Sequence, residues 1–125
     1  MRLLLDTQVF IWVTIDSPRL KTSARALLVE AEETYVSAAS IWEIAIKARL
    51  GKIDADPREM TMAIEGSGFR ELPVTTRHAA GVGDLPFHHH DPFDRLLIAQ
   101  AISEPLRLVS ADAMLARYSE LVLLV

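Results

Sequence analysis

The chain has 125 residues, with 13 lysines and arginines against 17 aspartates and glutamates, so its formal net charge is −4. Half of the residues are hydrophobic, which excludes a disordered chain, and a pI near 5.5 excludes a generic basic nucleic-acid binder. The absence of cysteine excludes a disulfide framework and a cysteine-based zinc site, and it fits a reducing cytoplasm. We therefore expect one cytoplasmic domain over residues 1–125.

Nothing in the sequence predicts a membrane segment. The longest apolar stretches, such as residues 9–13, are far shorter than the ~18–20 residues of a spanning helix. Asp6 comes too early for the apolar core of a signal peptide. The mean hydropathy of +0.22 is high, so either the core is dense or a partner covers some apolar surface.

Short apolar runs alternate with longer amphipathic stretches along the chain. Residues 3–5 are typical of a strand buried on both faces. Asp56 and Asp91 each combine a helix cap with a following proline, and Gly51 fits a left-handed helix end. In chain order we predict a strand at 3–5, helices at 9–13 and 23–33, a strand at 34–37, helices at 40–50 and 56–66, a strand at 69–72, a helix at 75–82, a loop at 88–90, a helix at 91–102, a strand at 106–109, a helix at 112–118 and a strand at 121–124. This alternation predicts a three-layer α/β/α domain with a central, mostly parallel sheet.

Four carboxylates that lie far apart in the sequence share one kind of position, at or near the start of a predicted helix. They are Asp6, Glu43, Asp94 and Asp112. Right-handed crossovers bring strand carboxyl ends and helix N-termini to one edge of a parallel sheet, which is where ligands bind. We therefore expect these four side chains to converge.

Each carboxylate also has a purely structural interpretation. Ser40 and Glu43 have the spacing of a capping box, and Glu43 can pair with Lys47 one turn later. Asp91 fits an N-cap, and Asp94 is favoured by the positive end of the helix dipole. The two remaining acids fit ordinary caps. These interpretations stay open for each residue taken alone.

A cluster of all four carboxylates would need its negative charge to be neutralised. Two carboxylates about 4 Å apart repel by roughly 4 kcal/mol at an effective dielectric near 20, so cations or protons must neutralise them. Oxygen ligands without cysteine or an obvious histidine partner favour Mg²⁺, with Mn²⁺ as a substitute. Such a site suits phosphodiester hydrolysis. The backbone amides at the helix N-termini would add hydrogen-bond donors for the phosphate group.

Four segments, in this order and at these intervals, carry a resemblance that covers nearly the whole chain. They are Leu4-Leu5-Asp6-Thr7, residues 37–47, residues 90–101 and Val109-Ser110-Ala111-Asp112. They resemble the PIN-domain ribonucleases, and most closely the VapC-type toxins of toxin–antitoxin pairs. The resemblance implies that Asp6 and Asp94 are the first and second metal ligands. It implies that Glu43 and Asp112 bind metal directly or through water.

The resemblance extends to hydroxyl groups beside these acids. Thr7 and Ser110 match such positions, and the family more often has threonine where this chain has Ser110. Asp91 is better assigned to a cap than to metal because Pro92 follows it.

The function that the resemblance implies is Mg²⁺-dependent cleavage of RNA, leaving 5′-phosphate and 3′-hydroxyl ends. The implied partners are an RNA substrate and a cognate antitoxin, in a homodimer or a toxin–antitoxin heteromer. Two alternatives stay open. One is a PIN-type RNA-processing nuclease without an antitoxin, and the other is a non-catalytic interaction module whose acids are only caps.

Several other residues have two interpretations. The histidines at 88–90 are expected in a solvated loop near the mouth of the site, and His78 on a helix surface. Lys47 and Arg95 either contact phosphate or pair with nearby acids.

The two tryptophans are interpreted differently from each other. Trp42 is expected to pack in the core. Trp12, close to Asp6, is expected to line a groove for a partner.

Overall fold

Five strands form one sheet in which every neighbouring pair is parallel, in the order β3-β2-β1-β4-β5. The computed structural model describes residues 1–125. Its strands are β1 (Arg2–Leu5), β2 (Glu33–Ser37), β3 (Arg70–Leu72), β4 (Arg107–Ser110) and β5 (Val122–Leu124). In the register of the central strands, Leu4 of β1 lies opposite Tyr35 of β2 and Leu108 of β4.

Six α-helices and two short 3₁₀ helices connect the strands. They are α1 (Thr7–Thr14), α2 (Thr22–Glu30), α3 (Ala38–Arg49), α4 (Pro57–Gly66), α5 (Thr76–Gly81), η1 (Val82–Asp84), α6 (Pro92–Ser103) and η2 (Leu115–Arg117). The helix predicted at 112–118 is wrong, because only the short η2 turn forms there. Asp112 caps that turn by accepting from the Met114 amide (2.9 Å).

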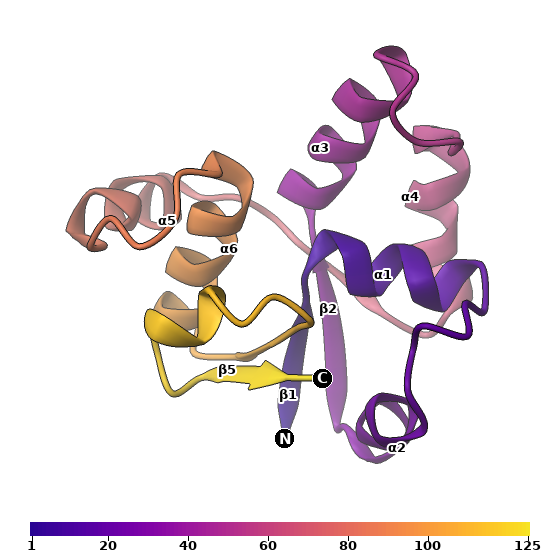
Figure 1. Ribbon diagram of the computed structural model, residues 1–125, viewed down its shortest axis with the longest axis horizontal. Helices are drawn as coiled ribbons and strands as arrows, with labels where there is room; N and C mark the ends of the chain where they lie inside the picture. Colours follow the sequence, from indigo (N-terminus) through magenta and orange to yellow (C-terminus); the bar gives the residue numbers. More distant parts are fainter.

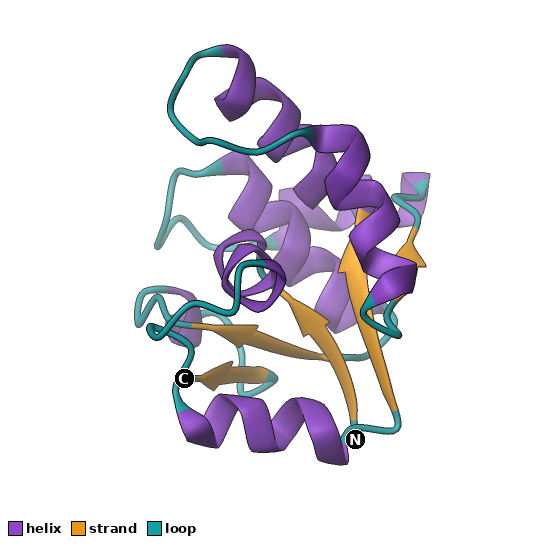
Figure 2. Cartoon of the chain, turned by 90° about the vertical axis from the view of Figure 1, so that its right-hand side faces the viewer, coloured by secondary structure: helices purple, strands orange, loops and turns teal.

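The helices cover both faces of the sheet, which confirms the three-layer α/β/α architecture. Leu3 and Leu5 point to one face, where they pack with buried residues of α1, α2, α3 and α4. Leu4 points to the other face and packs with Leu97 and Ile98 of α6. Figure 1 shows the two helix groups apart, with α5 and α6 on the left and α3 and α4 on the right. Figure 2, turned by 90°, shows the strands lying between helices.

Local sequence signals define most helix ends as predicted. The carboxylates of Asp56 and Asp91 accept from backbone amides at the start of α4 and α6, each followed by a proline. Gly51, just after α3, has a φ of 72°, the left-handed conformation that glycine adopts without a steric penalty.

The start of α3 differs from the prediction. Its N-cap is Ser37, whose hydroxyl accepts from the Ala39 amide (3.0 Å), so Ser40 and Glu43 do not form a capping box. Both serines are suitable caps, and the end of β2 at Ser37 selects the earlier one. Glu43 consequently lies in the second turn of α3.

Two predictions about burial are wrong. His78 is buried (2% exposed) because its ring helps to cap α5 and contacts Glu104 at 2.6 Å. Trp42 is 60% exposed. Trp12 is partly buried and packs against the core, and its place in a groove for a partner stays a prediction. Apolar residues lie on all sides of α3, so their pattern does not show which side is buried. Ile44 packs against the sheet, and Trp42 does not. No helix has the combination of length and apolar composition that crossing a membrane requires.

Candidate functional site

The carboxyl ends of β1, β2 and β4 meet at one edge of the sheet, beside the start of α6. The chain leaves β1 and β2 directly into α1 and α3, as Figure 1 shows. The Asp6 amide donates to the Val109 carbonyl (3.0 Å), which ties the ends of β1 and β4 together. The strand order reverses direction here, because β4 returns to the side of β1 opposite β2. This is the edge at which parallel sheets bind ligands.

Asp6 is buried at this edge and has two hydrogen-bond partners. Its side chain accepts from the Val9 amide (2.8 Å) and caps α1, and the Ser110 hydroxyl also bonds to it. Burial, with a smaller contribution from the charges of Glu43 and Asp112, nevertheless raises the pKa of Asp6 to about 6. The negative charge of this carboxylate is therefore poorly compensated by the protein.

Glu43 extends from α3 into the same space and is 5% exposed. Its Oε1 accepts from the Thr7 hydroxyl (2.7 Å), and the Ser40 hydroxyl lies 2.9 Å from that of Thr7. Its Oε2 is 2.6 Å from Lys47 Nζ, which confirms the pairing interpretation of Lys47. This hydrogen bond raises the pKa of Lys47, so the lysine keeps its positive charge beside the acids.

Asp94 lies in the first turn of α6, three residues after the cap. Asp91 Oδ1 accepts from the amides of Phe93 (2.9 Å) and Asp94 (3.2 Å), which confirms its capping role. Burial raises the pKa of Asp94 to about 7, and repulsion from Asp91, Asp6 and Glu43 acts in the same direction. Two of the four predicted acids therefore hold protons more tightly than ordinary aspartates.

Asp112 completes the group from the segment after β4. Its amide donates to the Ser110 hydroxyl (3.0 Å), so Ser110 joins Asp112 to Asp6. The structure thus brings the four predicted carboxylates together, around one cavity of about 180 Å³. Its lining residues are Asp6, Thr7, Gln8, Ile11, Glu43, Ile44, Lys47, Ile53, Asp91, Asp94 and Asp112.

His89 is a functional candidate that the sequence reasoning missed. Its Nε2 lies 3.3 Å from Asp112 Oδ2 and 3.5 Å from Asp94 Oδ2. The prediction of a solvated loop without a histidine partner for the acids is therefore wrong at this residue. A signal existed in the sequence, because His89 lies two residues before the Asp91 cap of the helix that carries Asp94.

Arg95 contacts neither the cavity nor an acid, so both interpretations of this residue are wrong. The side chain is 6% exposed, and its guanidinium donates to the carbonyls of Pro86 (2.8 Å) and Val82 (3.2 Å). It also lies over the ring of Phe87, 4.4 Å from the centroid. Arg95 therefore shapes the loop that carries His89.

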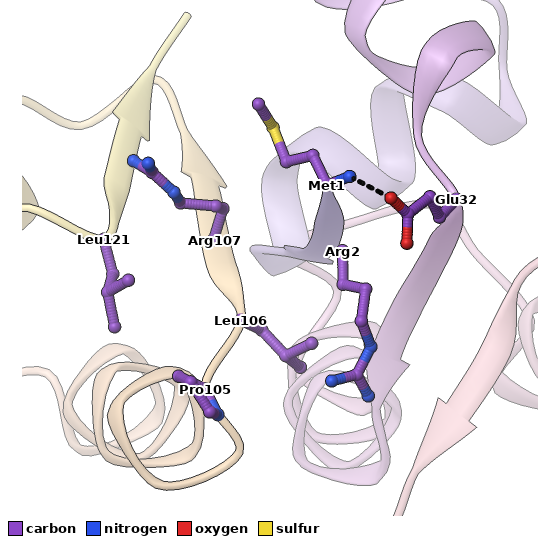
Figure 3. Close-up of a pocket in the computed structure, with 7 residues that line it drawn as sticks. All are labelled: Met1, Arg2, Glu32, Pro105, Leu106, Arg107 and Leu121. Atoms are coloured by element: carbon purple, nitrogen blue, oxygen red, sulfur yellow. Dashed lines mark hydrogen bonds and ion pairs between the residues drawn. The ribbon is translucent and has the colours of Figure 1, made fainter.

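A larger cavity, of about 440 Å³, lies at the opposite, amino-terminal ends of β1 and β4 (Figure 3). Arg2 and Arg107 line it, and its one carboxylate, Glu32, pairs with the amino group of Met1 (3.1 Å). It therefore offers no cluster of acids. The size of a cavity therefore does not identify the candidate functional site in this structure.

Comparison with known proteins connects this site to one family. A model of the PIN domain family matches residues 3–121. Ribonuclease VapC22 of Mycobacterium tuberculosis is 33% identical over 111 residues, which are 87% of this chain and 85% of the relative.

Solved structures share the fold at lower identity. A toxin–antitoxin complex from Klebsiella pneumoniae contains a chain with a TM-score of 0.68 and 17% identity, covering 97% of this chain and 95% of that one. VapBC2 of Rickettsia felis, bound to a DNA fragment from its promoter, contains a chain with a TM-score of 0.68 and 15% identity. The match covers 100% of this chain and 98% of that one. FitAB bound to a DNA fragment contains a chain with a TM-score of 0.66 and 20% identity, and the match covers 97% of this chain and 93% of that one. The family match over nearly the whole length, together with the VapC relative, shows that the chain belongs to the PIN domain family.

Proposed function

We propose that the chain is a single-domain, Mg²⁺-dependent endoribonuclease and the toxin of a toxin–antitoxin pair, acting in the cytoplasm. The observation that carries this proposal is the convergence of Asp6, Glu43, Asp94 and Asp112 around one small cavity. The relative named as a ribonuclease supports RNA as the substrate.

The donor set fits a hard divalent cation. The cavity is lined by five carboxylates against the one ammonium group of Lys47. Burial first, and then repulsion among the acids, raises the pKa values of Asp6 and Asp94, and this lysine does not offset either effect. Oxygen ligands of this kind favour Mg²⁺ or Mn²⁺, which would be held by the four predicted acids. This need for compensation argues against an interaction module whose acids serve only as caps.

In the proposed reaction, a water oxygen bonds to phosphorus, and the bond from phosphorus to the 3′ oxygen breaks. By analogy with the family, the products carry a 5′-phosphate and a 3′-hydroxyl. A bound Mg²⁺ would acidify the water, orient the phosphate and stabilise the leaving oxygen. Thr7 and Lys47 orient the Glu43 carboxylate, and Ser110 orients that of Asp6.

The proposed antitoxin would bind apolar surface, either on a monomer or on a homodimer of this chain. Trp42, Ile46 and Leu50 form an exposed apolar stripe along α3 and are 60%, 38% and 62% exposed. Three of the solved structures that share the fold are VapBC, FitAB and another toxin–antitoxin complex. The stripe offers the kind of surface that protein partners cover.

The metal dependence is tested by thermal unfolding and by an RNA cleavage assay. We expect millimolar Mg²⁺ or Mn²⁺ to raise the melting temperature by several degrees, because the ion binds the folded site alone. RNA should be cut only when one of these ions is present. An unchanged melting temperature together with cleavage in EDTA would contradict the proposal.

The toxin role is tested separately, by expressing the chain alone in a bacterial host. We expect growth to arrest within a few generations. Co-expression with a small protein encoded next to it should restore growth. Normal growth despite Mg²⁺-dependent cleavage in vitro would favour the RNA-processing nuclease without an antitoxin.

A further inference from the structure

The orientation of the His89 ring is fixed by two kinds of contact. Its Nδ1 lies 3.0 Å from the Asp91 amide nitrogen, which can only donate. Nδ1 must therefore accept, and the proton of the neutral ring is on Nε2. That Nε2 faces the carboxylates of Asp112 (3.3 Å) and Asp94 (3.5 Å), which can only accept when ionised. Both nitrogens thus have matching partners in a single tautomer.

This tautomer bears on how His89 relates to a metal ion. One nitrogen of His89 and one oxygen each of Asp94 and Asp112 lie within 4.8 Å of one another, a spacing that could hold an ion. For Nε2 to bind an ion, however, the ring proton would have to move to Nδ1, where it would meet the Asp91 N–H. The contact with the Asp91 amide therefore favours a hydrogen-bond donor over a metal ligand.

The loop that carries His89 is held by two side chains from elsewhere in the fold. The Tyr118 hydroxyl accepts from the amides of His89 (2.7 Å) and His88 (3.1 Å), and it donates to the His89 carbonyl (3.2 Å). The buried guanidinium of Arg95 binds the carbonyls of Val82 and Pro86 at the preceding turn. His89 itself is only 22% exposed. The ring is therefore held in place by the fold before any ligand arrives.

We propose that His89 is a positioning residue, whose Nε2–H holds the Asp112 and Asp94 carboxylates in the orientation that the proposed metal site requires. This inference rests on the proposed function. It assigns to His89 a hydrogen bond to Asp112 and a close contact with Asp94, with no bond to the ion. Tyr118 and Arg95 act one step further away, by fixing the loop.

Three substitutions separate this role from the alternatives. In His89→Gln the amide nitrogen can reach the place of Nε2, whereas in His89→Asn the shorter side chain reaches only the place of Nδ1. His89→Leu keeps the bulk and removes every donor. Mn²⁺ affinity is measured by calorimetry and RNA cleavage by steady-state kinetics, and circular dichroism verifies that each variant is folded.

We expect His89→Leu and His89→Asn to weaken Mn²⁺ binding by about 10–100-fold, which is the usual effect of removing a residue that hydrogen-bonds to a metal ligand. They should lower kcat with little change in KM. His89→Gln should stay within about threefold of wild type in both measurements. If His89→Leu matched the wild type, or if His89→Gln were as damaged as His89→Leu, the positioning role would be wrong.

A spectroscopic measurement on the wild type distinguishes a donor from a ligand. Proton–nitrogen correlation spectra at pH 8 should show the His89 ring proton on Nε2, both without metal and with saturating Mg²⁺. A shift of the proton to Nδ1 on adding Mg²⁺ would make His89 a ligand and overturn the inference. Wild-type protein that neither binds metal nor cuts RNA would instead refute the proposed function, while the tautomer can still be read.

Discussion

Replacing Asp94 by asparagine is expected to lower Mg²⁺-dependent RNA cleavage by more than about 100-fold. Removing a residue that only hydrogen-bonds to a metal ligand already lowers metal affinity or activity by about 10–100-fold. Asp94 is proposed to bind the ion itself, so its loss should cost more. Asparagine keeps the size of the side chain but removes the charge. Fluorescent RNA substrates would give the rates, and growth arrest in cells should disappear with them.

Asp56→Asn is the matched control for this substitution. Asp56 also lies at a helix start, where its Oδ1 accepts from the Arg58 amide (2.9 Å), but it does not line the acid cavity. It should keep wild-type cleavage, since asparagine is an equally good cap. If Asp94→Asn cut RNA as fast as Asp56→Asn, the assignment of the site would be wrong.

The metal-free protein is expected to lose stability as the pH rises from 5 to 8. The pKa values of Asp6 and Asp94 are about 6 and about 7 in the folded chain, against an ordinary value of 3.8. The folded state therefore binds more protons than the unfolded state in this range, and raising the pH favours unfolding. One pKa unit corresponds to about 1.4 kcal/mol, so we expect the free energy of unfolding to fall by roughly 2–4 kcal/mol. Urea titrations in EDTA would measure it.

Asp6→Asn should remove part of this pH dependence. Without the buried charge, the metal-free variant should be about 2–3 kcal/mol more stable than wild type at pH 8, and the difference should shrink toward pH 4. Asparagine can still accept from the Val9 amide, so the cap of α1 is retained. Mg²⁺ should stabilise the wild type more than the variant. A variant less stable than wild type at pH 8 would contradict the buried-charge argument.

The convergence of the four acids could be predicted from the sequence because local rules determine it. Asp6 directly follows a buried strand, and Asp94 follows a cap-and-proline signal. Parallel topology then brings strand ends and helix starts to one edge, whatever the details of packing. The same reasoning predicted the layers of the fold and all five strands.

Contacts across long sequence distances could not be predicted in this way. Arg95 and Tyr118 meet at the loop of residues 88–90 only after the chain has folded. The pattern of apolar residues does not decide which side of α3 faces the sheet, which is why the core position predicted for Trp42 is wrong. The role of His89 depends on the contacts of Tyr118 and Arg95, since its ring is oriented by a loop without periodicity.

The exposed Trp42 gives this protein a built-in optical reporter. It directly precedes Glu43, and its ring meets Phe93, the neighbour of Asp94, edge to face at a centroid distance of 4.9 Å. Trp12, the other tryptophan, is packed against the core. The emission of Trp42 therefore comes from a solvated indole next to two of the four acids, so its intensity can follow ions, nucleotides or a partner at this edge without a label.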